Sequence, residues 1–414
     1  MLGLPLRQIS LDQFIRGANT YMESINVREL LLRDLIIGPS LCMSGLCYSI
    51  FKLDLYQWCE HRCLYCYSRM LPLKEKRMAL QMGREFLNNL RALERALGDY
   101  PIFRMSTLTD AFHPSERIYK FSLKSLATCL REEIPLIIST KSTLITKEPW
   151  LSVIRKLSDE KLAIVQYTII TPNEKQSKIL EPYAPSPEER LGACKKLRDL
   201  GVPVVVRLQP LIPGVNTDVR LLNTLLDDLE DVGVLQVIAE FFRFSQWRLL
   251  SDISKAAING KLLTSRSTWT KYPLSPYKRP VLGIRLKVLE NLKKLCDEHG
   301  LLFSTCREGF FHLHTASSCC GTHVLKRGLV KPTLYEVWKL KNEGKAIMSE
   351  DFYKQLRHEY QAGNVKFITP DMLNNVPSKE FKIKLLQHFK LLKNLVHDNS
   401  LLIEICPSFA LSSH

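Results

Sequence analysis

Short apolar runs alternate with amphipathic helical patterns through the middle of the chain. The apolar runs begin near residues 101, 134, 162, 202 and 234. Between two of them, Ser186 is followed three residues later by Glu189, a capping box, and the helical pattern ends on Gly201. Runs that are apolar on both faces, separated by amphipathic helices at this spacing, predict successive right-handed βαβ units around a parallel sheet.

With 49–58 as the first strand, the pattern gives six units by about residue 242. Six units are too few for a closed eight-stranded barrel, so the predicted fold is α/β, a partial (β/α)6 TIM-like barrel with its chemistry at the carboxyl ends of the strands. Amphipathic helices from residue 334 onward predict a helical cap. The predicted division is an N-terminal extension (1–48), the barrel (49–245), a basic, aromatic-rich segment with a helix (246–300), a cysteine- and histidine-rich segment (301–330) and a C-terminal helical region (331–414).

Three cysteines stand directly after the first predicted strand, in the stretch DLYQWCEHRCLYCYSRM (54–70). Cys59, Cys63 and Cys66 on one loop can converge on three corners of an iron–sulfur cube and leave the fourth iron without a ligand from this motif. A zinc knuckle is the structural alternative, but zinc sites usually add a second cysteine pair or downstream histidines, and the nearest candidate, His61, lies inside the same loop. The spacing therefore favours a cluster with one open iron.

This CxxxCxxC motif, with an aromatic residue before its last cysteine, resembles the radical SAM superfamily. Four further segments resemble the spore photoproduct lyase-like branch in order and spacing: TLTDAFHPSE, STKS, LEPYAPSPEERL and LQPLIPGVN, which follow the second to fifth strands. The resemblance covers residues 50–245. It implies a [4Fe-4S] cluster whose free iron is chelated by the amino and carboxylate groups of S-adenosyl-L-methionine (SAM), reductive cleavage of SAM to a 5′-deoxyadenosyl radical, and hydrogen abstraction from a substrate.

The resemblance also implies cofactor contacts at the strand ends. The backbone of Tyr65 would lie against the adenine, and Thr109 and Asp110 would contact the methionine ammonium. The chain lacks the Gly-Gly-Glu motif that is common at this position. The other implied contacts, at the third to sixth strands, are Ser139, Lys141, Thr168, Thr171, Arg207, Gln209 and Glu240. Polar residues at strand ends are also often simple loop caps. A long cation such as Lys141 or Arg207 near an apolar strand end nevertheless needs a partner, which a cofactor carboxylate would supply.

A second group of thiols lies in the stretch 300–323. Its members are Cys306, Cys319, Cys320 and the histidines His312, His314 and His323. They are candidate ligands of an auxiliary iron–sulfur cluster, with Cys42 and Cys47 as further candidates. A structural zinc site is a second interpretation, and thiols without a metal, one of them a hydrogen-atom donor, are a third.

The charge of the chain points to an anionic partner. Its net charge is +16, and residues 241–300 hold 12 Lys or Arg against 4 Asp or Glu, so half of the excess lies in this window. The stretch 265–280 interleaves cations with Trp269, Tyr272 and Tyr277, a composition typical of proteins that bind single-stranded nucleic acid or a flipped base. A solvated loop of a basic protein is the alternative.

The number of cysteines, together with the start of the sequence, indicates the cellular compartment in which we expect the protein. The chain has 12 cysteines but starts without an apolar core and small-residue cleavage site, so we expect reduced thiols and a cytoplasmic location without membrane attachment.

Two functions stay open from the sequence. The first is a radical SAM enzyme acting on nucleic acid, by lesion repair or base modification; the second acts on a protein, a peptide or a small metabolite and uses the auxiliary cluster. Both require an external electron donor such as ferredoxin or flavodoxin. A non-catalytic zinc-binding adaptor is a third hypothesis.

Overall fold

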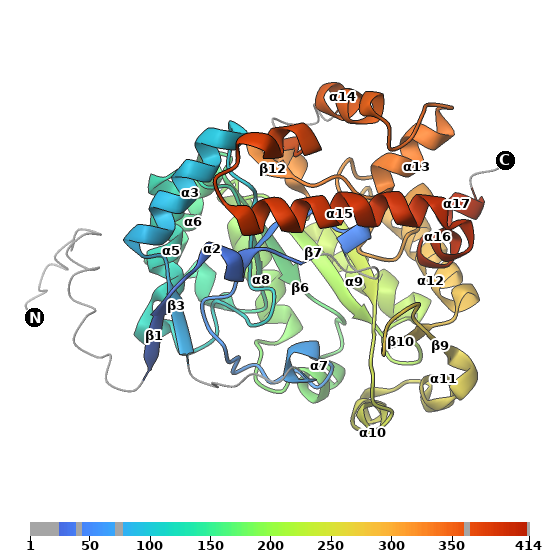
Figure 1. Cartoon of the computed structure of the whole chain (residues 1–414). Coiled ribbons are helices and arrows are strands. Elements are labelled where there is room, and N and C mark those ends of the chain that lie inside the picture. The colour runs from blue at the N-terminus through green and yellow to red at the C-terminus, as the bar shows by residue number, and fades with distance from the viewer. Residues whose placement is uncertain (1–24, 39–43, 71–77, 360–364, 412–414) are drawn as a thin grey trace, which may run out of the picture.

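A seven-stranded parallel sheet forms the centre of the computed structural model, which describes residues 25–38, 44–70, 78–359 and 365–411 (Figure 1). From one edge to the other the strands are β2 (Phe51–Leu53), β4 (Phe103–Met105), β5 (Leu136–Thr140), β6 (Ala163–Thr168), β7 (Val204–Leu211), β8 (Gln236–Phe241) and β11 (Leu302–Thr305). The six predicted strands are confirmed. The seventh, β11, comes from the 301–330 segment and pairs with β8 in parallel, so the sheet is one strand larger than the sequence predicted.

Helices connect consecutive strands, as βαβ units require. The main ones are α3 (Arg84–Leu97), α5 (Phe121–Arg131), α6 (Trp150–Asp159), α8 (Pro187–Asp199), α9 (Val219–Asp231) and α12 (Leu282–Glu298). The predicted capping box is present at the start of α8, where Ser186 accepts from the backbone N–H of Glu189. The stretch 115–133 has the pattern of one amphipathic helix in the sequence, but it is split into α4 (Glu116–Tyr119) and α5, because Lys120 takes a left-handed conformation with φ of 56°.

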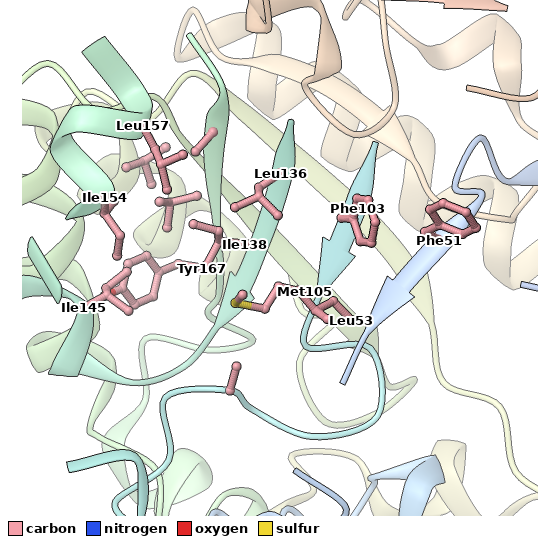
Figure 2. Close-up of a cluster of buried hydrophobic side chains, with 14 of the residues drawn as sticks. Phe51, Leu53, Phe103, Met105, Leu136, Ile138, Ile145, Ile154, Leu157 and Tyr167 are labelled. Atoms are coloured by element: carbon pink, nitrogen blue, oxygen red, sulfur yellow. The ribbon is translucent and has the colours of Figure 1, made fainter. Parts of the chain in front are cut away.

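Side chains alternate between the two faces of the strands. One set packs outward against the helices and is buried (Figure 2): Phe51, Leu53, Phe103, Met105, Leu136 and Ile138, with Ile154 and Leu157 of α6. The intervening set faces the inside of the curved sheet. Near the starts of the strands this inner set is apolar, as at Ile137, Ile164 and Val205, and toward the carboxyl ends it becomes polar.

The C-terminal region closes the inside of the sheet at its amino end. It contains α13 (Leu334–Asn342), α14 (Glu350–Glu359), α15 (Lys379–His397), α16 (Asn399–Ile405) and α17 (Ser408–Leu411), with the paired strands β12 (Gly328–Val330) and β13 (Val365–Phe367). Val337, Phe352 and Leu392 share one buried cluster with the inner residues at the strand starts. The helical cap therefore covers the end of the sheet opposite to the cysteine loop.

Smaller elements surround the carboxyl end. Figure 1 shows α7 (Glu174–Leu180), α10 (Arg248–Ile253), α11 (Gly260–Thr264) and the hairpin of β9 (Trp269–Lys271) and β10 (Lys278–Pro280) at this end of the molecule. The short strands β1 (Asn26–Glu29) and β3 (Met78–Gln81) pair in parallel at one side, near α2 (Leu32–Leu35). Within the described ranges, no helix is both long and apolar enough to cross a membrane.

Candidate functional site at the carboxyl ends of the strands

The loop after β2 brings Cys59, Cys63 and Cys66 together. The backbone N–H of Cys66 donates to the carbonyl of Cys63 at 3.2 Å, and that of Leu64 donates to the carbonyl of Leu180 at 2.8 Å, which fixes the loop to the end of α7. Figure 1 shows this loop beside α7. None of these three cysteines is part of a disulfide bond.

Burial raises the pKa of Cys59 to about 11 and that of Cys63 to about 12. For each thiol, the neighbouring cysteines of the motif raise the pKa further, while the Lys141 ammonium beside Cys63 opposes the shift. Thiols in this state keep their protons until a metal displaces them. Three neighbouring thiols next to one half-buried ammonium are the donor set and the counter-charge that an anionic iron–sulfur cluster requires.

Among the described residues, no group of three His, Cys, Asp or Glu side chains is arranged to hold a single metal ion. An iron–sulfur cube does not need such a single-ion site, because each cysteine binds a separate iron atom of the cube. Three thiols on one short loop are the donor set of a [4Fe-4S] cluster with one open iron, whereas the described residues give no single-ion site for a zinc knuckle.

Asp110 follows β4 and fixes the loops around the cysteines. Its carboxylate accepts from the Thr140 hydroxyl at 2.8 Å and from the backbone N–H of Lys141 at 2.7 Å, and it lies 3.2 Å from Nε2 of His61 in the cysteine loop. Burial would raise the pKa of Asp110, but the hydrogen bonds and His61 hold it well below its usual range. Thr109 donates to the carbonyl of Tyr56 at 2.8 Å. Both side chains thus position loops, and their predicted contacts to the methionine ammonium stay predictions.

A buried ion pair supports the other side of the cysteine loop. Arg190 of α8 lies 2.5 Å from Glu181, and both side chains are at most 1% exposed. The Tyr65 hydroxyl donates to the same carboxylate, and the Lys141 ammonium lies 3.9 Å from it and 5.7 Å from the Tyr65 ring. Arg190 also donates to the carbonyl of Thr168 at the end of β6, at 3.0 Å. This network sets Tyr65 and Lys141 beside Cys63.

Two arginines on the inner face of the strands contact neutral amides. Arg104 and Arg207 both donate to the amide oxygen of Gln166, at 2.9 and 2.8 Å, and Ser139 approaches the same oxygen at 3.3 Å. Arg207 also donates to the amide oxygen of Gln209. Burial and the nearby Arg104 lower the pKa of Arg207. Since Arg207 and Gln209 are only half-buried, they present a cation and an amide to the inside of the barrel.

Glu240, at the end of β8, is held between two arginines. Its carboxylate accepts from Arg243 and Arg307, each at 2.7 Å, and Arg243 also reaches Glu308 at 3.0 Å. The sequence singled out Glu240 but neither arginine nor Glu308. Nothing in the local pattern marks them, because they come from separate strand ends.

The second thiol group lies deep inside the sheet. The sulfurs of Cys319 and Cys320 are 3.4 Å apart, and Arg104 donates to the sulfur of Cys320 at 2.9 Å. The hydrogen bond from Cys319 and the two arginines Arg104 and Arg207 lower the pKa of Cys320. Burial and the carboxylate of Glu240 raise the pKa of Cys306 to about 12.

Two histidines of this stretch, His312 and His314, have other contacts. His314 lies 2.9 Å from the backbone N–H of Thr305 and His312 lies 2.7 Å from the hydroxyl of Ser408. A zinc site built from these cysteines and histidines therefore has no support among the described residues. Cys42 lies outside the described residues, and Cys47 is half-buried.

Comparison with known proteins agrees with this geometry. Residues 53–225 match the model of the Radical SAM superfamily. That range holds the three cysteines, Asp110, Lys141, Glu181 and Arg207. Residues 53–225 are therefore a radical SAM domain, the domain of radical SAM enzymes, and the resemblance to this superfamily is confirmed.

The curated relatives cover only part of the chain. An uncharacterized protein of Acidianus two-tailed virus is 30% identical over 201 residues, which cover 44% of this chain and 64% of that protein. An uncharacterized protein of Methanocaldococcus jannaschii is 26% identical over 168 residues, with 40% and 61% covered. The chain thus spans less than two thirds of the length of these relatives.

Solved structures share the fold. A spore photoproduct lyase mutant with bound AdoMet and dinucleoside spore photoproduct superposes with a TM-score of 0.50 at 15% identity, over 74% of this chain and 86% of that chain. A second mutant of this lyase gives a TM-score of 0.51 at 14% identity, with the same shares covered. At this identity the similarity shows a common fold, and the partial radical SAM barrel predicted from the sequence is confirmed.

The sequence analysis missed Glu181 and Arg190, although the local sequence around them contains a signal for a buried ion pair. Glu181 and Arg190 both lie in the segment LEPYAPSPEERL, which the sequence analysis quoted only for its resemblance. A glutamate just after one helix and an arginine inside the next, around the end of a buried strand, are candidates for a buried ion pair. Their pairing across the cysteine loop required the tertiary structure.

Proposed function

We propose that the chain is a radical SAM iron–sulfur enzyme that acts on nucleic acid. The convergence of Cys59, Cys63 and Cys66 beside Lys141, at the carboxyl end of the sheet, is the observation that carries the proposal. When bound at this loop, a [4Fe-4S] cluster and SAM would supply a 5′-deoxyadenosyl radical that takes a hydrogen atom from the substrate.

The residues of the chain would bind and orient the cofactor, and they would exclude water from the site. Lys141 offsets the negative charge that three thiolates bring into a buried loop, and Tyr65 packs beside it. Arg207 supplies the cation for a carboxylate of the cofactor, since its present partners are neutral amides. The buried layer beneath these residues keeps the site closed from the amino end of the sheet.

Nucleic acid as the substrate class is supported by the position of the basic segment. Phe244, Leu250 and Trp269 of this segment share one buried cluster with Cys63 and Tyr65. The segment with half of the excess charge and the cysteine loop therefore belong to the same buried cluster. A polyanion held there would lie at the carboxyl end of the sheet, where the site opens.

The rings available for base stacking differ from those predicted. Trp269 and Tyr272 are buried, 7% and 1% exposed, so the prediction that they stack on bases is wrong. Trp269 instead donates to the carbonyl of Leu263 at 2.8 Å. The exposed ring is Trp247, 36% exposed, with the guanidinium of Arg266 at 5.8 Å and the ammonium of Lys278 at 5.5 Å from its centre. A ring between two cations suits one base and its flanking phosphates.

The first experiment tests the chemistry. The protein is reconstituted with iron and sulfide without oxygen, and iron, sulfide and deoxyadenosine are measured after dithionite and SAM are added. We expect four irons per chain and deoxyadenosine formation, both absent in the variant Cys63→Ala. A colourless parent protein that yields no deoxyadenosine would refute the proposed radical SAM chemistry.

The second experiment tests the substrate class. Single-stranded DNA and RNA are retained on filters at several salt concentrations by the parent, by Trp247→Ala and by the control Tyr183→Ala, which removes an exposed ring elsewhere. Losing one stacked base should weaken retention by about 1–3 kcal/mol in Trp247→Ala only. Retention without salt dependence, or tight binding of a peptide instead, would favour the second class of substrate.

The auxiliary cluster stays a prediction, and we propose that Cys306, Cys319 and Cys320 remain thiols. The 3.4 Å between the sulfurs of Cys319 and Cys320 is shorter than two cysteines on separate irons of one cube allow, so the pair supplies at most one corner. A variant lacking all three should therefore keep the iron count of the parent. Loss of four irons in this variant would instead support an auxiliary cluster at these cysteines.

A further inference from the structure

A cavity of about 300 Å³ lies on the outer side of the cysteine loop. Its walls come from this loop and from the segments that follow β4, β5 and α7. The lining residues are His61, Phe112, Pro114, Arg117, Ser142, Thr143, Leu144, Tyr183, Ala184 and Pro185. None of them has a role in the function proposed above.

The cavity comes within a few residues of the thiols. His61 lines it and stands in the chain between Cys59 and Cys63, so the wall of the cavity is the cysteine loop itself. On the facing side Ser142 lines the cavity, while the adjacent Lys141 lies against Cys63. One residue of backbone therefore separates the cavity from the groups that surround the thiols.

The rim of this cavity combines exposed apolar side chains with cations. Tyr183 and Arg117 line the cavity and are both exposed, Tyr183 by 61%, and Ile118, the neighbour of Arg117 in α4, is 62% exposed. The guanidinium of Arg62 lies 5.5 Å from the centre of the Tyr183 ring. The carboxylate of Glu60, on the same loop, accepts from the backbone N–H of Ser115 at 2.8 Å and from its hydroxyl at 2.7 Å, so local hydrogen bonds engage this acid.

We propose that this cavity and its rim dock an acidic one-electron carrier protein, which reduces the cluster through the cysteine loop. The inference rests on the proposed function, because only a cluster at Cys59, Cys63 and Cys66 gives the electron a destination. One electron leaves the reduced carrier, which is oxidised by one electron, and enters the cluster, which passes from the 2+ to the 1+ state. The cations of the rim and the net charge of +16 favour an acidic partner. Exposed apolar residues within a charged rim are typical of protein docking sites.

The experiment follows reduction of the reconstituted holoprotein in a stopped-flow apparatus. The probe is an acidic flavodoxin reduced to its hydroquinone, whose oxidation to the semiquinone is visible apart from the cluster. Arg117→Glu and Tyr183→Glu place a negative charge on the rim. We expect each to lower the second-order rate of reduction about tenfold at low salt, and the parent rate to fall with ionic strength.

Two controls separate this inference from the proposed function. Lys294→Glu changes an exposed cation on α12, far from the rim in sequence and outside the cavity lining, and should leave the rate unchanged. Dithionite, which needs no docking site, should reduce the cluster equally in all variants; if it reduces none, the proposed function fails rather than the docking site. Equal flavodoxin rates in the parent and both rim variants would overturn the proposal. So would a loss of nucleic-acid retention in the rim variants with an unchanged flavodoxin rate, which would assign this surface to the nucleic acid.

Discussion

The ion pair between Glu181 and Arg190 should be the most sensitive point of the cysteine loop outside the cysteines. In Arg190→Met the carboxylate of Glu181 loses its guanidinium partner and keeps the Tyr65 hydroxyl, the Ser177 hydroxyl at 3.4 Å and the Lys141 ammonium at 3.9 Å. Breaking a buried pair by removing one partner costs about 3–5 kcal/mol, since the other charge stays buried and unpaired. That range is about two to three and a half orders of magnitude in the folding equilibrium.

The assay is urea unfolding of the apoprotein at neutral pH, followed by circular dichroism. The matched control is the double variant Glu181→Leu with Arg190→Met, which removes both charges and should recover a large part of the loss. The tie from Arg190 to the Thr168 carbonyl is also lost, so recovery should be incomplete. If Arg190→Met costs less than about 1 kcal/mol, or the double variant is less stable than it, the pair does not support the loop as argued here.

Three further outcomes are expected. Cys63→Ala should bind no cluster iron after reconstitution, whereas Cys129→Ala, which removes a buried helix thiol, should bind the full amount; equal iron in both would contradict the assigned ligands. Lys141→Met should weaken SAM binding at least about tenfold in equilibrium dialysis, with partial rescue in Lys141→Arg, because a cation beside the cluster loop is lost. Burial raises the pKa of Glu116 from 4.5 to about 6, so the folded state binds the proton more tightly than the unfolded state. Stability should therefore fall by about 2 kcal/mol in total as pH rises from about 3.5 to about 7, and Glu116→Gln should lack that slope in urea titrations across this range.

The sheet and most helices follow from local signals. The apolar runs, the Ser186 capping box and the glycine after α8 each act within a few residues, and the structure has them where the sequence predicts. β11 was missed because four residues of a short run carry little periodicity, and only pairing with β8 makes them a strand. The break at Lys120 was missed because a left-handed lysine has no local sequence signal.

Burial decided which of the polar and aromatic residues are available for chemistry. Tyr272 reads as a stacking ring in the sequence, but it packs beneath Arg279 at 4.1 Å from its centre, and Trp247 takes the exposed position. Asp110 reads as a cofactor contact, yet its oxygens are engaged by Thr140 and by the loop that follows β5.

The sequence by itself determined the domain type, and it placed the proposed cluster ligands Cys59, Cys63 and Cys66 on one loop whose short spacing limits how far apart the thiols can be. Only the tertiary structure decided what surrounds them. Glu181, Arg190 and Lys141 come from different strand and helix ends, and they meet because parallel strands bring their carboxyl ends to one edge. The outer cavity arises in the same way, from loops that follow separate elements, and no local pattern in the chain could have predicted its shape.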